Sequence, residues 1–150
     1  MNMTDELNVV MEEITRLKKE NLKKQNSIEE LSLNHERQID ALLNDFISVI
    51  DAYEKAEAKI KEMELPEDAN IQRVIKRLLQ PKRTALSVLF KNGVSQIDII
   101  DKPLDEDLCT VVETEPDSEK ANDIVITIEK NGYMRGERLI RRAEVVIVRN

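Results

Sequence analysis

The feature that most constrains this chain is the absence of glycine and proline from residues 4–64. The first proline is Pro66 and the first glycine is Gly93. A run of this length without either residue predicts one long helix, extending about 90 Å at about 1.5 Å per residue. A small domain cannot cover such a helix, so we expect its apolar side to need a partner chain.

Apolar residues recur along this helix at spacings of three and four, the pattern of a two-stranded coiled coil. Polar residues interrupt the seam at Asn21, Lys24, His35 and Gln38, and the apolar register shifts from Ile39 onward. We interpret His35 as a tolerated polar seam residue rather than a ligand or a pH switch. The predicted seam residues of a homodimer, short helices included, are Leu7, Val10, Ile14, Leu17, Ile28, Leu31, Leu42, Phe46, Val49, Ile50, Tyr53, Leu78, Leu79, Leu86 and Leu89.

Two short amphipathic helices are predicted within residues 66–93. Asp68 or Asn70 is expected to cap the first, and Pro81 to separate the two helices or kink one. Two chains would together contribute these helices to a bundle. The stretch carries six basic and two acidic residues in a chain of net charge −7, which raises the alternative of a nucleic-acid binder. Its basic residues lack interleaved aromatic side chains and have acidic flanks, so we expect no nucleic-acid partner.

From Val94 onward the hydrophobic period changes from helical to two. We predict strands in SQIDII, LCTVVET, DIVITIEK and RLIRRAEVVIV, with Asn131-Gly132 as a hairpin turn. In the last segment, Arg141 and Ala143 would share one face with Val145. The predicted fold class is therefore α+β, with a long dimerisation helix in 1–65, dimeric bundle helices in 66–93 and a small β domain in 94–150.

The residue types argue against an enzyme, a metal site or a cofactor. Cys109 and His35 are the sole residues of their kinds and fall on different predicted elements, which disfavours a nucleophile–base pair or a zinc site. The sequence has no glycine-rich phosphate loop. A single cysteine cannot form an intrachain disulfide, and no apolar run approaches ~20 residues. We therefore expect a cytoplasmic protein that does not enter a membrane.

The C-terminal segment resembles the signature of the GrpE family, the nucleotide exchange factors of DnaK-type chaperones. The matching residues are Gly132-Tyr133, Glu137-Arg138, Ile140-Arg141, Ala143, Val145 and Ile147. The helical segment FISVIDAYEKA resembles another family segment at Val49, Asp51, Glu54 and Ala56, and FKNGVSQI resembles the family's helix exit into its β domain. The sequence departs from the family pattern at four positions: Cys109 replaces a usual histidine, Val111 lies where an alanine is usual, Ser48 replaces a proline, and Pro81 falls within a bundle helix. The segment around Cys109 is also roughly two residues shorter than in the family pattern.

The resemblance implies a homodimer whose β domain binds the chaperone's nucleotide-binding domain and opens its cleft, so that ADP leaves. It also implies a long helix that opens on heating, which the polar seam residues would favour. The alternative is a coiled-coil scaffold or adaptor without exchange activity. The residues expected to bind the chaperone are Pro103, Leu104, Asp105, Leu108, Gly132, Tyr133, Met134, Arg138 and Arg141.

Overall fold

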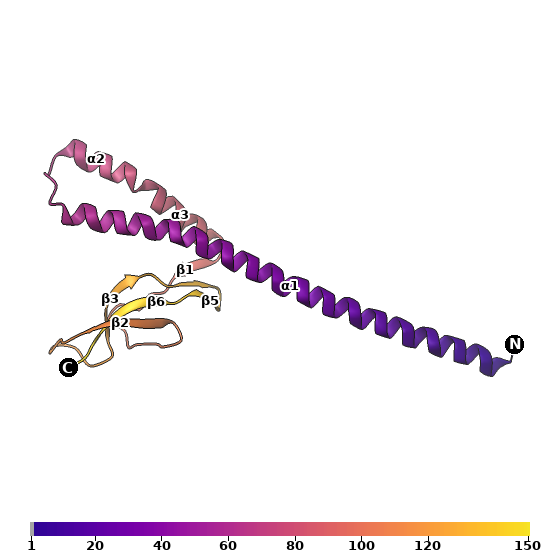
Figure 1. The fold of residues 1–150 in the computed structure, drawn as a ribbon. Helices are drawn as coiled ribbons and strands as arrows, with labels where there is room; N and C mark the ends of the chain where they lie inside the picture. The colour runs from indigo at the N-terminus through magenta and orange to yellow at the C-terminus, as the bar shows by residue number, and fades with distance from the viewer. Residues whose placement is uncertain (1) are drawn as a thin grey trace. The chain divides into compact units, whose positions relative to one another are not determined.

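The computed structural model describes residues 2–150 and confirms the α+β fold class, with helices followed by strands (Figure 1). By compactness the chain divides into two units, of which the first ends at Leu42 and the second comprises Leu43–Asn150. Helix α1 (Met3–Glu62) forms the described part of the first unit and begins the second. The element types change close to residues 65 and 93, but the division into domains 1–65, 66–93 and 94–150 stays a prediction.

In the first unit, the apolar side chains of α1 face solvent. The predicted seam residues here are 43–69% exposed: Leu7, Val10, Ile14, Leu17, Ile28, Leu31 and Leu42. An ion pair between Glu20 and Lys24, at 2.9 Å, joins neighbouring turns, but exposed pairs of this kind contribute little stability. A helix of this composition is stabilised mainly by covering its apolar stripe. Among residues 2–150, no helix has a stretch both long and apolar enough to cross a bilayer.

In the second unit, α2 (Ala69–Leu78) and α3 (Gln80–Lys91) follow the end of α1. The Asp68 carboxylate caps α2 by accepting the N–H groups of Asn70 at 2.8 Å and Ile71 at 3.2 Å. Pro81 lies in the first turn of α3, where a backbone N–H has no partner within the helix. The predicted separation of the two helices at Pro81 is confirmed.

The strands of residues 94–150 form two sheets rather than one. The first sheet has the order β1-β4-β5, from β1 (Val94–Gln96), β4 (Tyr133–Arg135) and β5 (Arg138–Arg141), with antiparallel neighbours. The second has the order β2-β6-β3, from β2 (Cys109–Glu115), β6 (Ala143–Val148) and β3 (Val125–Lys130). In this sheet β6 is parallel to β2 and antiparallel to β3.

The structure corrects the prediction of one continuous strand over residues 138–148. The strand breaks at Arg142, where the chain passes from the first sheet to the second. Arg141 and Ala143 therefore do not share a face of one sheet, as alternation would require. The predicted alternation also fails within β6, because Val145–Val148 are all buried. A central strand covered on both sides is apolar without a period of two.

The structure also corrects the predicted hairpin at Asn131-Gly132. These residues connect β3 to β4, which belong to different sheets. The hairpin lies instead between β4 and β5, where Gly136 adopts a φ of +59°. Asn-Gly favours a hairpin by local geometry, but here the pairing partners of β3 and β4 are set by contacts distant in sequence.

Two apolar cores form in the second unit. One lies on the second sheet and includes Ile97, Cys109, Val125, Val145 and Ile147. The other joins α1 and α3 to the first sheet, and its buried members are Ile47, Ile50, Leu89, Val94 and Tyr133. The first sheet is therefore packed against the helices by the aromatic ring of Tyr133 and the aliphatic side chains around it.

Candidate functional site

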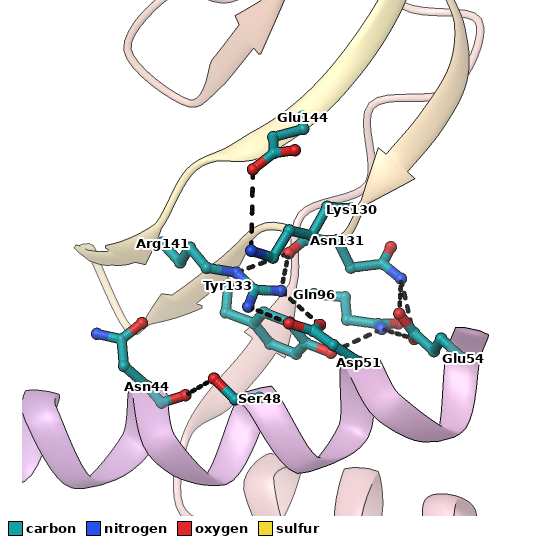
Figure 2. A network of polar contacts seen from close by, with 10 residues as sticks. All are labelled: Asn44, Ser48, Asp51, Glu54, Gln96, Lys130, Asn131, Tyr133, Arg141 and Glu144. Atoms are coloured by element: carbon teal, nitrogen blue, oxygen red, sulfur yellow. Dashed lines mark hydrogen bonds and ion pairs between the residues drawn. The ribbon is translucent and has the colours of Figure 1, made fainter. Parts of the chain in front are cut away.

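The polar side chains between α1 and the first sheet form one connected network, drawn in Figure 2. Asp51 and Glu54 lie three residues apart, so both point from the same side of α1 toward the strands. We call this cluster the helix–sheet network. It consists of Asp51, Glu54, Gln96, Asn131, Tyr133 and Arg141.

Arg141 is the centre of the network. Its guanidinium forms a bidentate ion pair with the Asp51 carboxylate, with N···O distances of 2.6 and 2.8 Å. The same group donates to the carbonyl oxygen of Asn131 at 2.7 and 3.2 Å, and it lies 5.4 Å from the centre of the Tyr133 ring. The side chains of Arg141 and Asp51 are 16% and 14% exposed. A bidentate pair with so little solvent fixes orientation as well as distance.

Glu54 holds the neighbouring strands to the same helix. Its carboxylate accepts the side-chain amide of Asn131 at 3.0 Å, and that of Gln96 at 3.5 Å. The Gln96 amide also donates to the hydroxyl oxygen of Tyr133 at 3.1 Å. Lys82 of α3 approaches Glu54 at 3.8 Å and pairs with Glu57 at 2.7 Å, which extends the contacts to a second helix.

Burial and pairing shift the pKa of several groups around this network. Burial acts to lower the pKa of Arg141, but the hydrogen bond and charge of Asp51 outweigh it, and the net pKa is raised. Burial raises the pKa of the Tyr133 hydroxyl, and the hydrogen bond from Lys82 lowers the pKa of Glu57. Arg141 and Tyr133 are therefore held in their cationic and neutral forms at neutral pH.

The residues predicted to bind a partner fall into three groups. Pro103, Asp105 and Arg138 are exposed, while Leu104, Leu108 and Met134 are half-buried against the core of the second sheet. Gly132 and Tyr133 are buried, and Arg141 is engaged by Asp51 within the chain. As direct contacts all nine stay predictions, but the last three face the chain's own interior in this structure.

The predicted seam residues from Leu42 onward also separate into three groups. Ile50 and Leu89 are buried in the chain's own core, so they offer no surface to a second chain. Leu42, Phe46, Val49 and Leu78 are exposed, and Tyr53, Leu79 and Leu86 are half-buried. We therefore leave Ile50 and Leu89 out of the proposed seam.

Sequence reasoning did not assign a contact to Asp51, Glu54 or Gln96, and it placed Asn131 in a hairpin turn. The available signal was the opposite charge of matched residues in two family segments, Asp51 in the helix and Arg141 in the C-terminal signature. Gln96 gave no comparable signal. Within the described part of the chain, no cluster of three or more His, Cys, Asp or Glu side chains is placed to hold a metal ion. The Cys109 thiol is buried, which raises its pKa.

Comparison with known proteins assigns the chain to a family. The family model described as GrpE matches residues 2–149. The chain belongs to the GrpE family. It is 35% identical over 107 residues to Protein GrpE of Porphyromonas gingivalis strain W83, a match covering 71% of this chain and 53% of that protein.

Two further relatives agree in extent. Protein GrpE of Parageobacillus thermoglucosidasius is 32% identical over 108 residues, covering 71% of this chain and 46% of the relative. Protein GrpE of Bacteroides thetaiotaomicron is 31% identical over 106 residues, a match covering 70% of this chain and 52% of that relative. The chain thus spans about half the length of the curated relatives it matches.

Proposed function

We propose that this chain is a nucleotide exchange factor of a DnaK-type chaperone and acts by binding that chaperone's nucleotide-binding domain. The observation that carries the proposal is the match to the GrpE family over residues 2–149. Exchange of this kind breaks no covalent bond, so it needs no catalytic side chain. It needs a surface that binds the open cleft better than the closed one. Shifting the ratio of open to closed clefts from 1:99 to 99:1 requires a difference of about 5.5 kcal/mol between the two binding free energies.

The proposed contact surface consists of the exposed members of the predicted set. Arg138 lies on β5 and is exposed, and its guanidinium can pair with a carboxylate of the partner. Pro103 and Asp105 are exposed in the segment before β2, and Leu104 and Leu108 anchor that segment on the core. Gly132, Tyr133 and Arg141 are assigned a supporting role beneath this surface.

A homodimer is part of the proposal, because much apolar surface on the helices is exposed. Besides the stripe of the first unit, α1 and α3 line a groove with Phe46, Val49, Tyr53, Pro81 and Val88. A second copy presents the same apolar side chains, as a two-fold interface requires. Sedimentation equilibrium should show a dimer for the wild type and a monomer for Val49→Asp. Val112→Asp, at an exposed position of β2 outside the groove, is the matched control and should stay dimeric.

The central test is release of a fluorescent ADP analogue from a DnaK-type chaperone, measured by stopped flow with and without this protein. We expect strong acceleration by the wild type, and a higher half-saturating concentration for Arg138→Glu. Arg142→Glu makes the same charge change at a neighbouring exposed residue outside the proposed contacts and should behave as the wild type. Binding without acceleration would contradict exchange activity and favour a scaffold.

Opening of the long helix on heating is the remaining part of the proposal. The polar seam residues Asn21, Lys24, His35 and Gln38 weaken the packing available to a second chain. Circular dichroism at 222 nm should therefore show a loss of helix at a temperature below the unfolding of the strands. A single transition that includes both would contradict this part of the proposal and leave the exchange function standing.

A further inference from the structure

The first sheet is attached to α1 in two ways that differ in directionality. Apolar packing joins Ile47 and Ile50 of the helix to Val94 and Tyr133 of the strands. Such packing favours burial but fixes orientation weakly, because the hydrophobic effect has no preferred direction. The helix–sheet network adds hydrogen bonds with defined donors and acceptors, and the bidentate Asp51–Arg141 pair fixes the plane of the guanidinium.

The network contacts every strand of the first sheet. Gln96 ends β1, Asn131 precedes β4, Tyr133 begins β4 and Arg141 ends β5, while both carboxylates come from one turn of α1 (Figure 2). A rotation of the sheet about its apolar contacts would break several of these hydrogen bonds together. The small exposure of the central ion pair means that water replaces the lost bonds poorly.

We infer that Asp51 and Arg141 are positioning residues for nucleotide exchange, which hold the first sheet at a fixed orientation on α1 so that binding selects the open state of the chaperone. The inference rests on the function proposed above. A sheet held in one orientation fits one arrangement of the cleft, whereas a loosely held sheet adjusts to the open and the closed arrangement alike. Binding that does not discriminate between two states does not shift their populations, however tight it is.

This role predicts a specific kinetic signature. In Asp51→Asn and Arg141→Lys, the maximal rate of ADP release at saturating protein should fall by about tenfold or more. The half-saturating concentration should change by less than about threefold, because the exposed contact residues are unchanged. Asp45→Asn and Arg142→Lys repeat the same chemical changes at exposed neighbouring positions and should leave both parameters at the wild-type values.

Stopped-flow release of the fluorescent ADP analogue over a concentration series measures both parameters. An unchanged maximal rate would overturn the inference. A change confined to the half-saturating concentration would also overturn it, because that is the signature of an ordinary contact. Circular dichroism and the unfolding temperature are recorded for each variant. Where Asp51→Asn does not fold, Glu54→Gln is used instead, since it weakens the bonds to Asn131 and leaves the central ion pair in place.

A distance measurement tests the same inference without the chaperone. Spin labels are attached at Lys59→Cys on α1 and Glu137→Cys in the β4–β5 hairpin, both exposed positions. Cys109 is buried and its pKa is raised, so it should escape labelling. Labelled protein is mixed with an excess of unlabelled protein, so that a dimer contains at most one labelled chain and the measured distance lies within that chain. The distance distribution should broaden in Asp51→Asn and keep its wild-type width in Asp45→Asn.

The two measurements separate failure of the inference from failure of the proposed function. A distribution of unchanged width in Asp51→Asn would overturn the inference whatever the kinetics show. Should the wild-type protein fail to accelerate ADP release, the proposed function is wrong, and with it the link to exchange. The distance measurement alone then decides whether the network holds the sheet in place.

Discussion

Replacing Gly132 by alanine should destabilise the second unit for a reason visible only in the structure. A Cβ at this position would lie 2.6 Å from the backbone nitrogen of Ala143 and 2.7 Å from Cδ1 of Ile97. The isoleucine side chain can rotate away. The Ala143 nitrogen cannot, because its N–H donates to the carbonyl of Leu108 at 2.9 Å and it begins the central strand β6.

The size of the effect follows from three contributions. Overpacking against a fixed backbone costs about 1–3 kcal/mol. Moving Gly132 away also weakens the bond from the Ile97 N–H to its carbonyl, 2.9 Å long, for about 1 kcal/mol. The lower entropy of the unfolded chain with alanine offsets about 0.5 kcal/mol. We expect a net loss of about 1.5–3.5 kcal/mol, which lowers the unfolding temperature of a unit of this size by roughly 6–15 °C.

Gly136→Ala is the matched control, because its Cβ would meet nothing within 4 Å. Its φ of +59° makes alanine unfavourable by about 1 kcal/mol after the same entropic offset. Urea unfolding followed by tyrosine fluorescence suits the comparison, since Tyr133 is fully buried and the sequence has no tryptophan. A loss for Gly132→Ala equal to or below that of Gly136→Ala would refute the steric reasoning.

Three further predictions concern groups around the helix–sheet junction. Lys82 lowers the pKa of Glu57, so their ion pair stabilises the fold at pH values above the usual glutamate pKa. This stability is lost as the pH falls below about 4.5. In Lys82→Met, the free energy of unfolding measured in urea should therefore depend less on pH in that range. Burial raises the pKa of Tyr133, so the free energy of unfolding of the wild type should fall as the pH rises above about 10. The fall should be smaller in Tyr133→Phe, and the same pH dependence in both proteins would contradict this prediction. Ile50 is fully buried, so Ile50→Ala should lower the free energy of unfolding by about 3 kcal/mol, measured in urea at one protein concentration. A loss below about 1 kcal/mol would contradict its place in the core.

The helical half of the molecule follows from local properties of the sequence. The absence of glycine and proline from residues 4–64 predicts the long helix, which the structure has at residues 3–62. Asp68, as the N-cap, and Pro81, in the first turn, mark the starts of the two short helices. These signals act within one or two turns, so one chain's sequence contains them completely. The α+β class and the family resemblance were accessible for the same reason, since each depends on contiguous segments.

The pairing of the strands was not accessible from local signals. Asn131-Gly132 has the composition of a hairpin turn, yet it connects two sheets, and residues 138–148 have the composition of one strand, yet they form two. Each outcome depends on which distant strand lies beside a segment. Gly132 is required by a close approach to Ala143 rather than by a turn, and sequence alone does not distinguish these two reasons for a glycine.

The sequence by itself determined that this chain has a long helix with an apolar stripe and an arginine-rich C-terminal signature of the GrpE family. Only the tertiary structure decided which of these arginines is exposed and which is enclosed. Arg138 and Arg141 are three residues apart in the same motif, but Arg138 is exposed and Arg141 is held by Asp51, 90 residues earlier. A charge in a sequence specifies what a side chain can bind. The fold specifies which partner is within reach, because that partner is brought there by packing elsewhere in the chain.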